Sequence, residues 1–305
     1  MNRIGYCCIN LSLNEDKKKK DQILVNRGMI KRTFESKGLN YVSELALKNI
    51  DDLEKIIKWN IENNIFVYRM SSDMFPCLGF YNILDLPNIG IIIDKLKRIG
   101  NLAKKHDMRL SFHPSHFCII ASENPNVIEN AIDELNKHAQ LMDLMDLDQT
   151  HYYPINIHIG TTKPTLEEAA KKFCLNFHKL SDSCKKRLTI ENDDSPNQYS
   201  VKMLYEWLHK EINIPIVFDQ HHFNYGPQDQ TMEEALKLAH STWGGIKPMT
   251  HMSSPRTLED NKVKQTAHAD YIYEEIQTYG LEFDIEIEAK AKDLAVIRYL
   301  KEFKI

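Results

Sequence analysis

Eight short β-rich segments, separated by segments with helical periodicity, constrain the fold of this chain more than any other feature. Each has the length of a strand: residues 3–7, 65–71, 109–113, 154–159, 187–192, 214–219, 247–252 and 283–289. Regular alternation of strands and helices predicts parallel strands joined by crossover helices. Eight such units predict a (β/α)8 TIM barrel. A doubly wound open sheet is the alternative, but its glycine-rich nucleotide turn, GxGxxG, is absent.

The segments between the strands place apolar residues at helical spacing. Stripes within residues 53–61, 89–99, 127–142 and 292–303 predict amphipathic helices. No linker rich in proline, glycine or serine divides the 305 residues, so we expect one domain over residues 1–305. Two pairs have the spacing of a capping box and predict helix starts: Thr165 with Glu168, and Thr231 with Glu234.

Composition narrows the class of protein. Hydrophobic residues make up 42% of the chain, which is enough to form a core. No apolar run approaches the ~18 residues of a membrane span, and the N-terminal segment runs into lysines rather than a signal cleavage site. We therefore expect a cytoplasmic protein with no membrane partner. The six cysteines show no CxxC spacing, so we interpret them as reduced packing residues.

A histidine or a carboxylate stands at or near the end of each of the last six predicted strands. These residues are His113, His158, Glu191, Asp219, His251 and Glu288. In a TIM barrel the carboxyl ends of the strands form the catalytic rim. Side-chain alternation in residues 154–159 directs Asn156 and His158 into the barrel. Because buried charges need compensation, the pattern predicts bound divalent ions, for which imidazole and carboxylate ligands suit Mn²⁺ or Zn²⁺.

Other interpretations of single residues remain open. Alone, His113 is typical of a buried core histidine and Glu191 of a salt-bridge partner, but the six positions together favour a site. His222 and His268 lie just beyond the rim and could hold a further ion. Glu286 shares the parity of Glu288, so it either pairs with an inward Arg69 or Arg3 or replaces Glu288 as a ligand. We favour Glu288 because it lies nearer the strand end.

Basic residues gather after the first strand, although the net charge of the chain is −4. The connection leaves the rim side of the barrel, so it is either a solvated basic loop or a track for a polyanion beside the metal site. Its cations are Lys17, Lys18, Lys19, Lys20, Arg27, Lys31, Arg32 and Lys37.

Over nearly its whole length the chain resembles the ultraviolet damage endonuclease family of DNA repair enzymes. The motifs that carry the resemblance occur in the family's order: RIGYCCIN at 3–10, YRMSSDMFP at 68–76, FHPSHF at 112–117, INIHIG at 155–160, TIEND at 189–193, FDQHH at 218–222, HMSSPR at 251–256, HADYI at 268–272 and EAKAKDLA at 288–295. The resemblance implies a TIM barrel related to endonuclease IV type enzymes. It also implies a site for three Mn²⁺ ions, with Zn²⁺, Mg²⁺ or Co²⁺ as substitutes.

The resemblance assigns roles to the rim residues. It implies that His113 and His158 hold one ion, which Glu191 bridges to a second ion. The second ion would be held by Asp219, His251 and Glu288, and a third by His222 and His268. Glu191, His222 and His268 would be the catalytic residues, with Glu191 acting chiefly as a bridge.

Six further residues would contact the DNA or the lesion: Tyr6, Asn10, Arg69, Ser71, His116 and Phe117. The family's loop after the third strand usually reads HPGQ followed by an aromatic residue. Here Phe117 keeps the aromatic side chain, whereas His116 replaces glutamine and changes the hydrogen bonding. Many relatives have a lysine where Met249 stands in this chain.

The function implied by the resemblance is nicking of double-stranded DNA immediately 5′ of ultraviolet photoproducts, leaving a 3′-hydroxyl and a 5′-phosphate. Cyclobutane dimers, 6-4 products and abasic sites are the expected substrates. We expect a monomer that is cytoplasmic and associates with the nucleoid when it acts on DNA. Two alternatives are a sugar isomerase on the same barrel and a damage-binding protein without catalytic activity.

Overall fold

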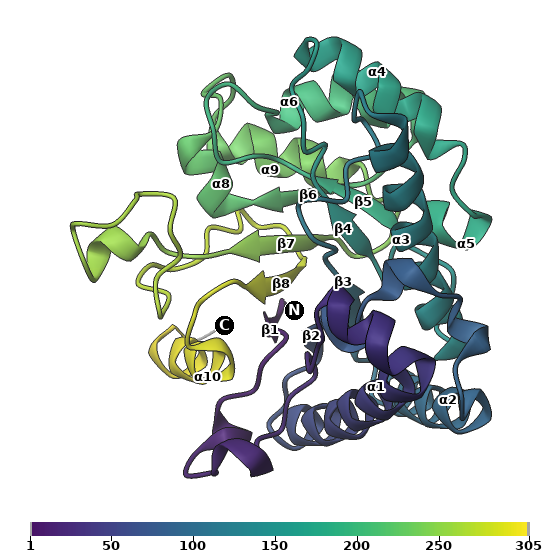
Figure 1. Cartoon of the computed structure of the whole chain (residues 1–305). Coiled ribbons are helices and arrows are strands. Elements are labelled where there is room, and N and C mark those ends of the chain that lie inside the picture. Colours follow the sequence, from purple (N-terminus) through teal and green to yellow (C-terminus); the bar gives the residue numbers. More distant parts are fainter. Residues whose placement is uncertain (1, 304–305) are drawn as a thin grey trace.

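Eight parallel strands close into a barrel in the order in which they occur in the chain (Figure 1). The computed structural model describes residues 2–303. Strand β8 pairs with β1 from Arg3 opposite Asp284 to Tyr6 opposite Ile287, which closes the barrel. The strands are β1 Arg3–Cys7, β2 Val67–Met70, β3 Arg109–Phe112, β4 Ile155–Ile157, β5 Leu188–Glu191, β6 Ile216–Asp219, β7 Met249–Met252 and β8 Asp284–Ile287. The predicted TIM barrel is therefore confirmed, and every strand lies within its predicted segment.

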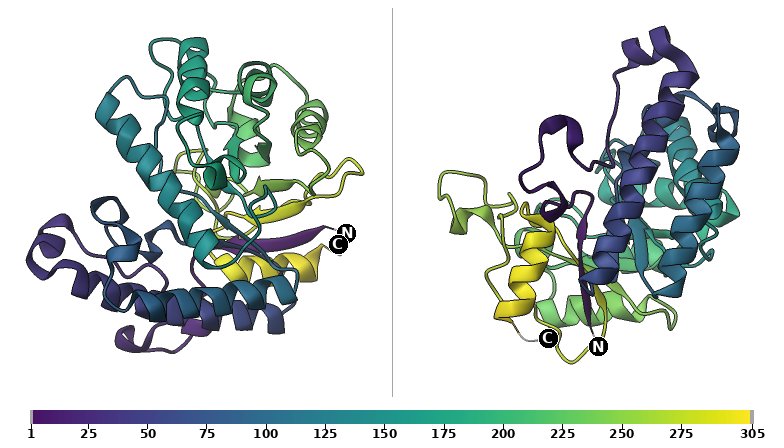
Figure 2. Two further views of the ribbon diagram at one scale, coloured as in Figure 1. Left: turned by 90° about the vertical axis from the view of Figure 1, so that its right-hand side faces the viewer. Right: turned by 90° about the horizontal axis from the view of Figure 1, so that it is seen from below.

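Helices cover the outside of the barrel, and Figure 2 shows α1 and α2 lying alongside each other there. The helices are α1 Lys31–Glu62, α2 Ile89–Lys105, α3 Pro125–Leu144, α4 Leu166–Phe177, α5 Asp182–Lys185, α6 Val201–Leu204, α7 Lys210–Ile212, α8 Gln220–Tyr225, α9 Met232–Ser241 and α10 Lys292–Glu302. A π-helical turn, Tyr205–His209, joins α6 to α7. Short 3-10 turns are Ser12–Asn14, Lys19–Asp21, Ser72–Met74, Leu78–Phe80, Ile83–Asp85 and Arg256–Leu258.

The predicted helix starts are found where the capping residues stand. Thr231 accepts a hydrogen bond from the backbone N–H of Glu234, and the Glu234 carboxylate accepts from the backbone N–H of Thr231, which completes the capping box of α9. Thr165 caps α4 by accepting from the backbone N–H of Glu168, and the Glu168 carboxylate accepts from the Thr165 hydroxyl at 2.8 Å rather than from its backbone N–H. These local bonds satisfy amide groups that a helix start otherwise leaves unpaired.

Helix α1 begins earlier than its apolar stripe predicts. Its first residues carry Lys31, Arg32 and Lys37, which are exposed and favour helix by propensity without adding an apolar face. Gly38 interrupts the helix with a φ of 62°, a conformation that residues with a Cβ rarely adopt. Part of the predicted basic loop is therefore helical.

The lower interior of the barrel is charged rather than aliphatic. Asp284 is fully buried and accepts hydrogen bonds from Arg3 at 2.9 Å and Lys247 at 2.6 Å, and Arg109 lies 3.3 Å from it. Buried charges of this kind are tolerated only when they are paired. One layer higher, Glu286 is paired with Arg69, so the predicted alternative of Arg3 is wrong.

All six cysteines are free thiols, as predicted, and three of them are buried. Among the described residues, no helix combines the length and the apolar character that crossing a bilayer requires.

Candidate metal centre

The six predicted rim residues lie together at the mouth of the barrel. His113, His158 and Glu288 directly follow β3, β4 and β8, while Glu191 and Asp219 end β5 and β6. His251 lies within β7 and opposes Asp219 across the strand pair. Residues that are distant in the sequence therefore converge because the carboxyl ends of parallel strands meet at one rim.

The rim residues form two groups that share Glu191. One group contains His113, His158 and Glu191, and the other contains Glu191, Asp219, His251 and Glu288. Within each group the candidate ligand atoms lie within 4.8 Å of one another. Nδ1 of His251 lies 3.0 Å and Nε2 of His113 lies 3.3 Å from Oε2 of Glu191. A carboxylate between two groups of ligands is the arrangement that bridges two metal ions.

Burial and opposite charges act against each other in this cluster. Burial alone would raise the pKa of Glu191, but the charges of His251 and His158 hold it well below its ordinary value. Burial would lower the pKa of His251, yet attraction to Glu191, together with hydrogen bonds to Glu191 and Glu286, raises it to about 10. Without a metal ion, protons on the histidines compensate the buried carboxylates.

Asp219 provides the clearest sign that the cluster suits a cation. Its Oδ1 accepts a hydrogen bond from the backbone N–H of His222 at 2.7 Å and caps α8. Its Oδ2 is buried and has no hydrogen-bond partner among the residues that the structure describes. A buried carboxylate oxygen without a partner is costly unless a cation approaches it. The mixed imidazole and carboxylate donors therefore fit a divalent ion of the Mn²⁺ or Zn²⁺ type.

The charge on His251 predicts a pH dependence of stability that metal should suppress. Because the pKa of His251 is raised from 6.5 to about 10, its contribution is complete below about pH 6.5 and is lost as the pH rises through 10. Denaturant unfolding with a chelator should show this loss, and a His251→Gln variant should show less of it. Saturating Mn²⁺ should reverse the trend, since metal ions bind neutral imidazole. Equal slopes for both proteins in chelator would contradict the assignment.

His222 and His268 approach each other less closely than the other predicted ligands. Nδ1 of His222 lies 3.1 Å from Oε1 of Glu191 and 3.0 Å from the carbonyl oxygen of Asn192. The ring of His268 lies 6.4 Å from that of His222 and 5.1 Å from that of His221. Neither His222 nor His268 joins a group of three ligand atoms in the described chain. The predicted third ion therefore has two candidate ligands here.

Arg69 and Ser71, which were predicted to contact DNA, are buried in this conformation. Arg69 donates from Nε to Glu286 at 2.7 Å and from Nη2 to Glu288. Ser71 accepts from the backbone N–H of Asp73 and is 5% exposed. Arg69 contacts both carboxylates, but Glu286 is also held by Ser111 below the rim, whereas Glu288 lies with Glu191, Asp219 and His251 in one group of candidate ligands. Glu288 is therefore the better placed ligand of the two.

Tyr6 and Asn10 are also inaccessible to DNA in this conformation. Both are 0% exposed. The Tyr6 hydroxyl donates to Oδ1 of Asn60 at 2.7 Å and accepts from Nδ2 of Asn10 at 2.8 Å. Strand alternation explains the burial, because Tyr6 points outward from β1 and packs beneath α1, where it contacts Asn60. These side chains join β1 to α1 instead of reaching a ligand.

His116 and Phe117 are exposed in the loop after β3, where the resemblance places the residues that probe the lesion. Their ring centroids lie 4.0 Å apart, and Phe117 is 73% exposed. Among the basic residues, Lys17 to Lys20 are exposed, whereas Arg27 is held by Asp52 at 2.6 Å.

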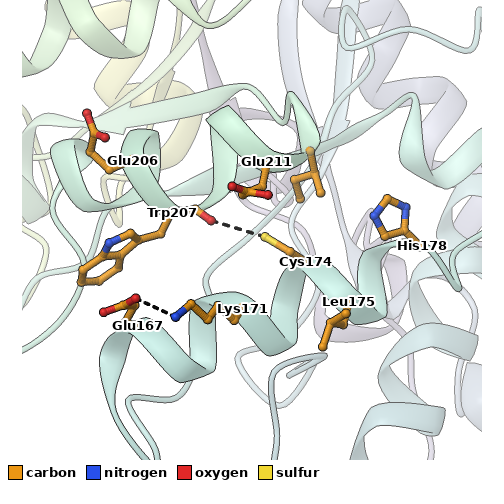
Figure 3. Close-up of a pocket in the computed structure, with 9 residues that line it drawn as sticks. Glu167, Lys171, Cys174, Leu175, His178, Glu206, Trp207 and Glu211 are labelled. Atoms are coloured by element: carbon orange, nitrogen blue, oxygen red, sulfur yellow. Dashed lines mark hydrogen bonds and ion pairs between the residues drawn. The ribbon is translucent and has the colours of Figure 1, made fainter.

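Two cavities differ in what they could bind. A pocket of about 350 Å³ beside the metal centre includes His113, His116, His158 and His222 in its lining. A pocket of about 560 Å³ lies on the outside of the barrel between α4 and the π-helical turn (Figure 3). There Glu167 pairs with Lys171 and Glu206 with Lys210, so two of its carboxylates are already neutralised. The rim pocket is the one that presents the predicted ligands.

The family model described as UV-endonuclease UvdE matches residues 2–305. This chain belongs to the UV-endonuclease family. A UV DNA damage endonuclease of Bacillus cereus (strain G9842) is 35% identical over 265 residues, which are 84% of this chain and 80% of that relative. Among solved structures, SacUVDE has a TM-score of 0.85 at 27% identity and covers 99% of both chains. Endonuclease IV from Thermus thermophilus, at 10% identity, has a TM-score of 0.54 over 82% of this chain and 93% of its own, which shows the fold alone.

Sequence reasoning missed residues of this UV-endonuclease family member that contact the predicted ligands. Asn156 donates to Glu191, and Asp193 lies beside His158. Asn192 and Asp193 follow Glu191 directly in the TIEND motif, where only Glu191 received a role. The position of Asn192 and Asp193 directly after β5 was the signal that could have identified them.

Proposed function

We propose that this chain is a metal-dependent DNA repair endonuclease that nicks the phosphodiester bond immediately 5′ of ultraviolet photoproducts. Its products would be a 3′-hydroxyl and a 5′-phosphate, and its substrates cyclobutane dimers, 6-4 products and abasic sites in double-stranded DNA. The sharing of Glu191 between two groups of ligands, in a chain of the UV-endonuclease family, carries the proposal. Residues 1–305 would act as one domain of a cytoplasmic monomer that associates with the nucleoid.

The rim residues supply ligands for the proposed ions. His113, His158 and Glu191 would hold one Mn²⁺, and Glu191, Asp219, His251 and Glu288 a second. His222 and His268 would contribute to a third, whose other ligands would come from the substrate. Bound divalent ions supply Lewis-acid stabilisation of the charge that develops on a phosphoryl group in the transition state. Zn²⁺, Mg²⁺ or Co²⁺, which carry the same charge, would substitute for Mn²⁺ at these positions.

The protein's own groups orient and bind the scissile phosphate. Glu191 remains ionised because its pKa is held well below the ordinary value despite its burial, so we assign it a bridging role rather than proton transfer. His222 and His268, whose ring centroids lie 6.4 Å apart, would face the leaving 3′ oxygen. Water is restricted there, since Glu191, Asp219 and His251 are almost fully buried.

Lesion recognition would combine stacking with backbone contacts. Phe117 and His116 present an exposed pair of rings that can wedge beside a damaged step. Damaged bases stack poorly, so displacing them costs less than displacing normal bases. The exposed residues Lys17 to Lys20 would contact phosphates without reading sequence.

Phe117→Ala should lower kcat/KM on damaged DNA by about 10- to 100-fold, because aromatic stacking on a base is worth about 1–3 kcal/mol. Metal content should not change, since Phe117 lies outside both groups of ligands. Leu175→Ala is the matched control: Leu175 is 70% exposed on α4, close to the exposure of Phe117. Equal kinetics for the Phe117 and Leu175 variants would remove Phe117 from lesion recognition.

The proposed function is tested by incubating an irradiated duplex oligonucleotide with the protein and Mn²⁺. We expect a single cut 5′ of the photoproduct, a 3′ end that a polymerase extends, and no cut in undamaged DNA. Binding of damaged DNA without cutting would support a damage-binding protein instead. A protein that neither binds nor cuts damaged DNA, but turns over ketose sugars, would be a sugar isomerase instead.

A further inference from the structure

The two residues after Glu191 contact three predicted ligands: His158 after β4, Asp219 at the end of β6, and His222 in α8. Asn192 and Asp193 lie at the end of β5, are 2% and 7% exposed, and carry no assigned role in the metal centre. Asp193 contacts His158 after β4, and Asn192 contacts Asp219 of β6. Because His158 and Asp219 belong to different groups of ligands, the two residues should affect different ions.

Asp193 contacts the first group through His158. Its Oδ1 lies 2.8 Å from Nδ1 of His158, while Nε2 of that imidazole faces Glu191 at 3.8 Å. The other carboxylate oxygen of Asp193 accepts from the backbone N–H of Tyr199 at 3.3 Å, and the Asp193 N–H donates to the Tyr199 carbonyl at 3.0 Å. The Tyr199 hydroxyl in turn donates to the Thr161 carbonyl at 2.9 Å. Asp193 is therefore held in place. Its Oδ1 contacts Nδ1 of His158 as a charged neighbour, although the two atoms are not aligned as a hydrogen bond, and Nε2 on the other side of the ring faces the shared ligand Glu191.

Asn192 contacts the second group through Asp219. Its side-chain Nδ2 donates to the Asp219 carbonyl at 3.0 Å, and its Oδ1 accepts from the Asp219 backbone N–H at 2.9 Å. This pair of bonds replaces strand pairing where β5 and β6 end. The carbonyl oxygen of Asn192 also lies 3.0 Å from Nδ1 of His222. Asn192 thus fixes the backbone from which the Asp219 carboxylate projects.

We propose that Asn192 and Asp193 are positioning residues with separate targets, Asp193 orienting His158 for the first ion and Asn192 orienting Asp219 for the second. The inference rests on the proposed metal centre and adds to it the residues that orient its ligands. Partners that hold a ligating histidine by its second nitrogen fix both its tautomer and its ring orientation. Removing such a partner typically weakens metal binding by about 10- to 100-fold.

The test measures metal binding itself. Purified full-length variants are titrated with Mn²⁺, and free Mn²⁺ is followed by electron paramagnetic resonance. Anomalous scattering from crystals grown with Mn²⁺ shows which position has lost its ion. Asp193→Ala should weaken the first position by about 10- to 100-fold and spare the second, whereas Asn192→Ala should do the reverse. Asp194→Ala is the matched control, because Asp194 lines the same pocket and contacts no predicted ligand in the described chain.

Conservative variants distinguish orientation from general damage to the fold. Asp193→Asn keeps an oxygen that can accept from His158 and should recover part of the affinity at the first position. Asn192→Asp keeps the acceptor for the Asp219 backbone and should recover part of the affinity at the second. Wild-type binding by both alanine variants, or equal losses at both positions in each, would overturn the inference. Failure of the wild-type protein to bind Mn²⁺ at either position would instead overturn the proposed metal centre.

Discussion

Replacing Glu191 with glutamine is expected to lower nicking of damaged DNA by at least about 1,000-fold. Glu191 is the one residue shared by both groups of ligands, and it is 1% exposed. An amide keeps the size of the side chain but removes the negative charge that attracts both cations. The variant should also lose metal, because His113, His158 and His251 would then face each other without the central carboxylate.

The measurement is single-turnover cleavage of an oligonucleotide with one photoproduct, together with metal content by mass spectrometry. Glu167→Gln is the control, since Glu167 is an exposed glutamate of α4 that pairs with Lys171 away from the rim. Its activity should match the wild type. If Glu191→Gln retained metal and cut at more than about a tenth of the wild-type rate, the shared carboxylate would not be central to catalysis.

Arg69→Met should destabilise the metal-free protein by about 3–5 kcal/mol, which is typical when one partner of a buried ion pair is removed. Arg69 lies between Glu286 and Glu288, and burial leaves its side chain 10% exposed. Without it, two carboxylates approach each other in the barrel, and His251, which contacts both of them, cannot neutralise two negative charges. Mn²⁺ should restore part of the lost stability, because an ion at Glu288 replaces some of the missing positive charge.

Denaturant unfolding in chelator and in Mn²⁺ measures both effects. Arg98→Met is the matched control, because Arg98 pairs with Glu54 on the surface and its side chain is 57% exposed. An exposed pair of this kind contributes about 1 kcal/mol or less. Equal losses for the two variants would show that Arg69 is not the internal counter-ion of the barrel.

The sequence predicted the architecture well because strand spacing and helix caps are local signals. Thr231 and Glu234 lie three residues apart and form their capping box without reference to the rest of the fold. The convergence of the rim residues was predictable for a related reason: residues such as His158 and Glu191 stand at strand ends, and strand ends converge in a barrel.

The surroundings of some predicted site residues depend on distant parts of the chain, which the sequence did not indicate. Tyr6 and Asn10 were expected at the lesion, but the facing α1 supplies Asn60 and buries them both. Arg69 was assigned to DNA, although β8 offers it two carboxylates inside the barrel. Motif position indicates that a residue matters to the family, but exposure and partners decide whether it touches a ligand.

The carboxylates along β8 also determine which alignment of that strand can close the barrel. Sliding β8 by two residues against β1 would keep Ile285 and Ile287 on the outer face, so apolar patterning alone would tolerate the error. The same slide would move Asp284 away from Arg3, Arg109 and Lys247, the three cations that it contacts, and in one direction would place Glu286 opposite Arg3 instead. The observed alignment is the one in which Asp284 reaches three cations and Arg69 reaches both Glu286 and Glu288, so the charge pairs favour it over alignments that hydrophobic packing alone would accept. The position of Glu288 at the rim depends on this alignment.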